Sequence, residues 1–156
     1  MKRLYRYTIP CYNGKRYGWL QFSPCREGTA ITFHDKEHEF LMFEVFSTPE
    51  FEAAYTYPGD DLGAVWTEGK TTFRVWAPTA AEVTVNLYRS GTPDTEDLIG
   101  QMHMQQDVKG TWVAERVGDL NGIYYTYLVM VDGHLCEACD PYARTTGVNG
   151  QRAMIL

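Results

Sequence analysis

The chain has 156 residues, enough for one ordinary domain or for one domain with an appendage. Its apolar content of 44% and aromatic content of 14% are enough to build a core, which argues against a disordered protein. The formal net charge of −6 argues against nucleic acid or an anionic membrane as partner, since both require a basic face, and no apolar run approaches the roughly 20 residues of a membrane span.

Residues 1–56 are predicted to form an N-terminal segment that is rich in strand-forming residues. Strand-like composition occurs at residues 5–9, 17–22, 30–34 and 40–46. A short helical turn is predicted near residues 48–55, because Ser47 or Thr48 can cap it and Pro49 falls near its first position. The residues before this turn are too few for a comfortable core of their own, so we expect them to pack on the rest of the chain.

From residue 57 onward, strand signals recur at short intervals with turn residues between them. Strands are predicted at residues 71–77, 82–88, 99–105, 111–117 and 123–131. Their apolar residues fall at every second position, which is typical of half-buried strands. Short strands at this spacing, with no amphipathic helix between them, predict an all-β fold, an antiparallel β-sandwich over residues 57–156. The residues expected in its core are Phe73, Val75, Val83, Val85, Leu87, Tyr127, Val129 and Val131.

The opposite faces of the same strands also carry large side chains. Trp76 and Tyr88 lie there on the first two strands, and Leu128 and Met130 lie there on the last. A sheet face in water would be more polar, so we expect these faces to be covered. Ordinary packing against a loop, docking of another domain and contact with a ligand all remain open. For docking of another domain, the candidates are Arg74, Trp76, Leu128 and Met130.

The four cysteines are expected to be free thiols in a reducing compartment; they are Cys11, Cys25, Cys136 and Cys139. Cys136 and Cys139 form a C-x-x-C, but a zinc site needs a second close pair, and Cys11 and Cys25 are too far apart. A thioredoxin-like motif would open a helix, whereas Asp140-Pro141 follows here.

No residues have the spacing of an active site, a metal centre or a cofactor site. His34 and His38 are four apart, yet the residues around them show no helical pattern, so we expect a solvated turn. There is no nucleophile elbow, P-loop or dinucleotide fingerprint. The basic start of the chain lacks the apolar stretch of a secretory signal, which favours a cytoplasmic protein, with a secreted parent whose signal was removed as the alternative. The apolar run at residues 153–156 ends in mid-strand, which favours a longer parent protein.

Four sequence blocks carry a resemblance to a known family. The blocks are Ser47-Thr-Pro-Glu-Phe-Glu with Tyr57-Pro-Gly-Asp-Asp-Leu-Gly-Ala; Thr72-Phe-Arg-Val-Trp-Ala-Pro-Thr-Ala; Gly110-Thr-Trp with Gly118-Asp-Leu-Asn-Gly-Ile-Tyr-Tyr-Thr-Tyr; and Asp140-Pro-Tyr-Ala-Arg with Gly147-Val-Asn-Gly-Gln-Arg. Together they resemble the N-terminal region of type I pullulanases, starch-debranching enzymes of glycoside hydrolase family 13. The module within that region is similar to carbohydrate-binding module family 48, an immunoglobulin-like β-sandwich.

The resemblance implies a non-catalytic module of an enzyme that hydrolyses α-1,6-glucosidic bonds. Such a module would dock on the catalytic barrel of the same polypeptide and assist recognition of branched α-glucan. The barrel alone needs about 250 residues, so this chain is not expected to be an enzyme by itself. The alternative is an autonomous α-glucan-binding module, whose candidate stacking residues are Trp76, Tyr88 and Trp112. Family members that grip glycogen have a tryptophan just after the last Asp-Gly turn, where this chain has His134 and Leu135. We therefore expect weak binding.

Overall fold

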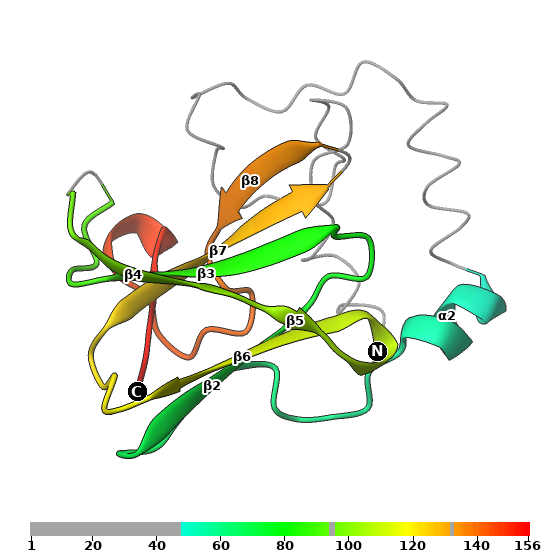
Figure 1. Cartoon of the computed structure of the whole chain (residues 1–156), viewed down its shortest axis with the longest axis horizontal. Coiled ribbons are helices and arrows are strands. Elements are labelled where there is room, and N and C mark those ends of the chain that lie inside the picture. Colours follow the sequence, from blue (N-terminus) through cyan, green and yellow to red (C-terminus); the bar gives the residue numbers. More distant parts are fainter. Residues whose placement is uncertain (1–47, 94–95, 132) are drawn as a thin grey trace.

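The computed structural model describes residues 48–93, 96–131 and 133–156, so the strands expected before residue 47 and the histidines His34 and His38 lie outside the described residues. Two antiparallel sheets pack face to face (Figure 1). The first sheet has the order β1 (Gly63–Trp66), β2 (Lys70–Trp76), β6 (Thr111–Val117) and β5 (Gln105–Gln106). The second has the order β4 (Leu98–His103), β3 (Glu82–Tyr88), β7 (Tyr124–Val131) and β8 (His134–Ala138), with β9 (Ala153–Met154) paired to β7. The predicted antiparallel β-sandwich is confirmed.

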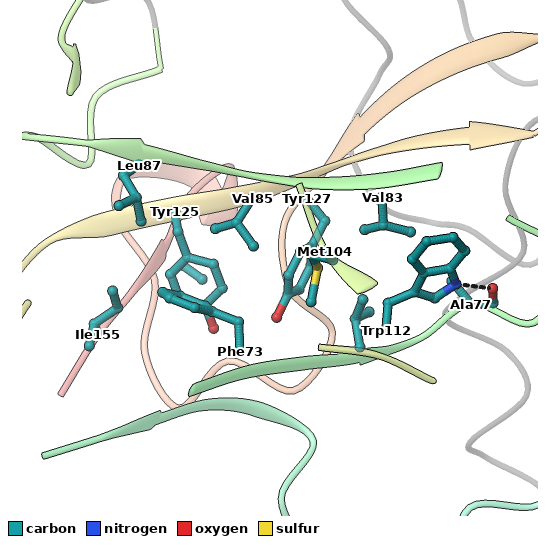
Figure 2. Packing of buried hydrophobic residues seen from close by; sticks show 12 residues of the cluster. Phe73, Ala77, Val83, Val85, Leu87, Met104, Trp112, Tyr125, Tyr127 and Ile155 are labelled. Atoms are coloured by element: carbon teal, nitrogen blue, oxygen red, sulfur yellow. Dashed lines mark hydrogen bonds between the residues drawn. The ribbon is translucent and has the colours of Figure 1, made fainter. Parts of the chain in front are cut away.

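The core lies between the two sheets and is built from alternate residues of their strands (Figure 2). All of the residues predicted to be buried are buried except Val129, which packs against the core but is only partly buried. Val129 lies opposite Cys136 of β8, which is the edge strand of its sheet. The ring of Phe73 meets Tyr125 edge to face, with 5.2 Å between the ring centroids, so the two sheets interlock through aromatic contacts.

One end of the sandwich, which we call the closed end, is covered by the helix α2 (Pro49–Tyr55) and the 3-10 turn η2 (Val108–Gly110), on the right of Figure 1. Thr48 is the N-cap of α2: its hydroxyl accepts a hydrogen bond from the backbone N–H of Phe51 at 3.2 Å, and proline follows it. Gly110 faces Pro78 so closely that a Cβ added there would lie 2.6 Å from the proline Cβ.

The opposite end, which we call the open end, is formed by loops and by the last residues of the chain. It comprises the β1–β2 turn, residues 89–93 and 96–97, the loop 118–122, the segment 145–150 with the 3-10 turn η3 (Val148–Gly150), and residues 155–156. Backbone hydrogen bonds join these pieces, from Gly118 to Gly69 at 2.8 Å and from Gly122 to Ile155 at 2.8 Å. No helix in the described part of the chain is long and apolar enough to cross a membrane.

The cysteines differ from the expectation in one respect. Cys139 is a free thiol, and burial raises its pKa to about 11. Cys136 is disulfide-bonded, and its partner lies outside the described residues. The expectation of free thiols is therefore wrong for Cys136, because local spacing does not reveal a pairing between cysteines far apart in the chain.

Candidate functional site

The two tryptophans predicted as stacking residues are packed inside the module. Trp112 is 7% exposed and lies between the sheets, where its indole N–H donates to the carbonyl of Ala77 at 3.0 Å (Figure 2). Trp76 is 5% exposed, and its indole N–H donates to the carbonyl of Tyr55 at 2.7 Å. The ring of Phe51 on α2 meets Trp76 edge to face. The face of β2 that carries Trp76 is thus covered, as expected, and the chain's own helix covers it.

Tyr88, the third predicted stacking residue, is 8% exposed. The guanidinium of Arg152 lies 3.7 Å from the centroid of its ring, a cation–π contact that occupies one ring face. The phenol donates a short hydrogen bond to Glu137. Burial, reinforced by that hydrogen bond, raises the pKa of Tyr88 above its ordinary value. Both the ring and the hydroxyl are therefore engaged within the chain.

Three tryptophans lie in the described residues, and of these Trp66 is half-buried whereas Trp76 and Trp112 are buried. Trp66 was not among the predicted site residues. It ends β1 at the open end, and its indole N–H donates to Oδ1 of Asp119 at 2.9 Å. The same oxygen accepts from the backbone N–H of Asn121 at 2.9 Å, so the loop 118–122 fixes the indole plane. The sequence analysis predicted no strand at β1 and therefore did not place Trp66 in the fold. Ala64 and Trp66, two residues apart, both pack against the core, and this alternation could have indicated a strand.

The outer face of the second sheet carries the remaining predicted docking residues, Leu128 and Met130. Both are half-buried. Beside them lies a polar cluster centred on Glu137, whose Oε1 accepts from the Thr126 hydroxyl at 2.6 Å and from the Asn86 amide at 3.2 Å. Sequence reasoning did not single out this cluster, which assembles side chains from three strands.

Arg74, also predicted for docking, is paired within the module. Its Nε lies 2.9 Å from Asp61 and its Nη1 lies 2.6 Å from Asp107, and the guanidinium is 5.4 Å from the ring centroid of Tyr57. The hydrogen bond from Arg74 holds the pKa of Asp107 below its ordinary value. The Gly-Asp-Asp-Leu-Gly block thus supplies an internal partner for Arg74.

Asp140, the first residue of the Asp-Pro-Tyr-Ala-Arg block, has a structural role. Its carboxyl is buried, with 4% of the residue exposed. Oδ2 accepts from the hydroxyls of Tyr125 at 2.5 Å and Tyr127 at 3.4 Å, and Oδ1 accepts from the backbone N–H of Tyr142 at 2.8 Å. Burial raises the pKa of Asp140 to about 6, although these hydrogen bonds favour the ionised form. Asp140 therefore ties the segment after β8 to β7.

Arg152 does the same for the Gly-Val-Asn-Gly-Gln-Arg block. Its Nη1 lies 2.8 Å from the carboxylate of Asp97 and donates to the carbonyl of Ser90 at 2.8 Å. Nη2 donates to the carbonyl of Pro93 at 3.2 Å. The two segments of the fourth sequence block, which contain Asp140 and Arg152, thus hold neighbouring parts of the chain in place. Among the described residues, no group of His, Cys, Asp and Glu could hold a metal ion.

Comparison with known proteins explains why these blocks occur together. Residues 61–143, more than half of the chain, match carbohydrate-binding module 48, the isoamylase N-terminal domain. The chain belongs to this family. The matched residues contain both main sheets and end just beyond Asp140, so the carbohydrate-binding module 48 fold is the sandwich described above.

Pullulanases are among the relatives of this chain. The pullulanase of Bacillus subtilis (strain 168) is 33% identical over 112 residues, which cover 72% of this chain and 15% of that protein. Pullulanase 1, chloroplastic, of Arabidopsis thaliana is 30% identical over 134 residues, 81% of this chain and 14% of that protein. The chain therefore spans about a seventh of the length of these relatives.

Solved structures give the same result. The pullulanase from Paenibacillus barengoltzii in complex with maltohexaose and α-cyclodextrin is 44% identical, with a TM-score of 0.66, over 70% of this chain and 17% of that one. The pullulanase from Anoxybacillus sp. LM18-11 complexed with maltotetraose is 37% identical, with a TM-score of 0.64, over 71% of this chain and 16% of that one. The resemblance drawn from the sequence blocks is confirmed.

Proposed function

We propose that this carbohydrate-binding module 48 domain is a non-catalytic part of a debranching enzyme of glycoside hydrolase family 13. In that enzyme it docks on the catalytic barrel of the same polypeptide and assists recognition of branched α-glucan. Similarity to pullulanases over a small share of their length supports this assignment.

The observation that favours docking over autonomous binding is the burial of all three predicted stacking residues, Trp76, Tyr88 and Trp112. A sugar ring stacks on an aromatic face that is open to solvent. Here those faces are occupied by the helix α2, by Arg152 and by the core. After the last hairpin turn, His134 and Leu135 are both exposed, and neither supplies the indole ring that glycogen-binding members have there.

Autonomous α-glucan binding is the second candidate, and Trp66 is the observation that favours it. Its indole is half-buried and its plane is fixed by Asp119. When a ring is already fixed before binding, less conformational entropy is lost as the ligand binds. A platform at Trp66 would lie at the open end, on the sheet opposite to the one that carries Tyr88.

Calorimetry of the chain with maltoheptaose separates the two candidates. For the docking module we expect a Kd no tighter than about millimolar, roughly −4 kcal/mol, and no release of reducing sugar from pullulan. Binding at tens of micromolar that is lost in Trp66→Ala and retained in Trp112→Phe would establish the autonomous module instead. Sustained hydrolysis abolished by a substitution in this chain would overturn the non-catalytic assignment.

A further inference from the structure

The disulfide at Cys136 joins the sandwich to the N-terminal part of the chain. The chain has four cysteines, and one of them, Cys139, is a free thiol. Cys136 is disulfide-bonded, so its partner is Cys11 or Cys25. Both candidates lie before residue 48, where the described part of the chain begins. The bond therefore fixes a point of residues 1–47 to a point of the second sheet.

Cys136 lies in the middle of β8, at the edge of the second sheet (Figure 1). Among the described strands, β8 pairs only with β7, so one side of β8 has no strand beside it. Cys136 lies opposite Val129 of β7, and directly opposite residues share one face of a sheet. Val129 packs against the core, so the side chain of Cys136 points to the core side of β8. The partner cysteine therefore meets the sheet where its free edge borders the core.

This border has both backbone and apolar surface for a cover to bury. An edge strand presents unpaired N–H and C=O groups, which natural proteins commonly cover with another part of the chain. Val129 is only partly buried, unlike the core residues of the same strand. Apolar residues accompany both candidate cysteines, with Ile9 shortly before Cys11 and Phe22 shortly before Cys25. Either stretch can therefore add apolar side chains beside Val129.

Cys139 completes the C-x-x-C motif, yet the fold keeps it away from the disulfide. An extended strand rises about 3.3 Å per residue, so the Cα atoms of Cys136 and Cys139 lie roughly 10 Å apart, whereas a disulfide needs less than about 7 Å. Burial, reinforced by the carboxylate of Asp140, raises the pKa of Cys139 to about 11. At pH 7 only about one such thiol in ten thousand is the thiolate that attacks a disulfide. The long-range bond is therefore protected from its nearest thiol.

We propose that residues 1–47 form a redox-controlled strap, which the Cys136 disulfide holds over the free edge of β8 and which reduction releases, whether or not the module docks on a barrel. A dithiol reductant supplies the chemistry. One of its thiolates attacks a sulfur of the disulfide and the first cysteine leaves as a thiolate; the second thiol then closes the reductant's own disulfide and frees the other cysteine. The strap is fastened in an oxidising compartment and loose in a reducing one.

Peptide mapping without reductant tests the pairing on the full 156-residue chain, purified under oxidising conditions. Free thiols are alkylated in denaturant before digestion. Trypsin then leaves Cys11 and Cys25 in separate peptides and keeps Cys136 and Cys139 together in peptide 117–144. We expect peptide 117–144 to be alkylated once, at Cys139, and joined to the peptide of one N-terminal cysteine. A bond between Cys136 and Cys139, or alkylation of both, would overturn the strap.

Hydrogen exchange with and without a dithiol tests whether the strap covers β8. Peptides of β8 should exchange at least about tenfold faster after reduction, while peptides of β3 and β4 stay unchanged and show that the sandwich remains folded. Cys136→Ser should give the fast exchange of β8 without any reductant. Cys139→Ser is the matched control, because it removes the free thiol of the same motif and should keep both the slow exchange and its response to reduction.

Two results would contradict the strap even if the pairing is found. If β8 exchanges at the same rate with and without the dithiol, residues 1–47 are tethered to β8 but do not cover it. If β3 and β4 lose protection together with β8, the disulfide stabilises the whole sandwich rather than holding a cover on one edge.

Discussion

The two ends of the sandwich are built from the same strands but finished differently. At the closed end, a helix from the same chain covers Trp76 and hydrogen-bonds to its indole through Tyr55. At the open end, Arg152 holds the loop after β3 through Ser90 and Asp97, while aliphatic side chains stay exposed. The comparison teaches that rigidity and coverage are separate properties: an end can be held in one conformation by buried polar contacts and still leave an apolar surface free.

The largest expected effect contrasts the tryptophans of the two ends. Trp112→Ala should lower the free energy of unfolding by about 3–5 kcal/mol, because it leaves a cavity between the sheets. Trp66→Ala should cost clearly less, because Trp66 packs at the margin of the core and is only partly buried. Urea denaturation of both variants measures the difference. Equal losses would mean that the open end is as tightly packed as the closed end.

The next effect concerns the ion pair that fastens the open end. Arg152→Met should destabilise the chain by about 3 kcal/mol, because it leaves the largely buried carboxylate of Asp97 without its arginine. The double variant Arg152→Met with Asp97→Asn should recover part of the loss, since no uncompensated charge remains. Denaturation midpoints of the single and double variants check this. If the double variant is no more stable than the single one, the charge of Asp97 is not the cause.

Asp140 should make the stability of the chain depend on pH. Its pKa is about 6 in the folded chain and 3.8 for an ordinary aspartate, so its favourable contribution is complete below about pH 4 and is lost as the pH rises through 6. The change amounts to at most roughly 3 kcal/mol. Unfolding free energies between pH 4 and 7 should show this fall, and Asp140→Asn should flatten it.

Asp107→Asn is the control for that profile, because the pKa of Asp107 is lowered and this group titrates below the pH window. The fall between pH 4 and 6 should persist in the control. A profile that is unchanged in Asp140→Asn would show that another group is responsible.

The smallest effect is a gain of stability at the open end. Thr71 is buried beside Trp66 on the neighbouring strand, and its hydroxyl has no hydrogen-bond partner among the described residues. Thr71→Val keeps the shape and removes the unpaired group, so it should add about 1 kcal/mol. Thr72→Val is the matched control, since the Thr72 hydroxyl bonds to Glu115 and its removal should give no gain. Urea midpoints decide between them.

Much of the sandwich could be predicted because its information is local. Alternation in β2 and β3 placed Phe73 and Val85 on the inner face, and the Thr48-Pro49 pair predicted the start of α2. The strands β1 and β8 escaped prediction, because β1 is short and begins at a glycine, and β8 mixes polar and apolar residues without a clear alternation.

The candidate site was less predictable because it depends on distant contacts. Alternation correctly placed Tyr88 on the outer face, yet nothing near it in the sequence indicates that Arg152, far along the chain, lies on its ring. In the same way, nothing in the sequence near Trp76 indicates that Phe51 and Tyr55 cover it. Tertiary packing by remote residues decides whether an aromatic ring is available to a ligand.

The contact between Gly91 and Gly147 has a consequence for how this domain can vary. A Cβ on Gly147 would lie 2.5 Å from the Cα of Gly91, and a Cβ on Gly91 would lie 2.8 Å from the Cα of Gly147. Both residues already lack a side chain, so a larger residue at one position cannot be compensated by a smaller residue at the other. We therefore expect homologous domains to diversify this corner by changing the lengths of the two loops, and directed-evolution libraries to recover insertions there more readily than substitutions of either glycine.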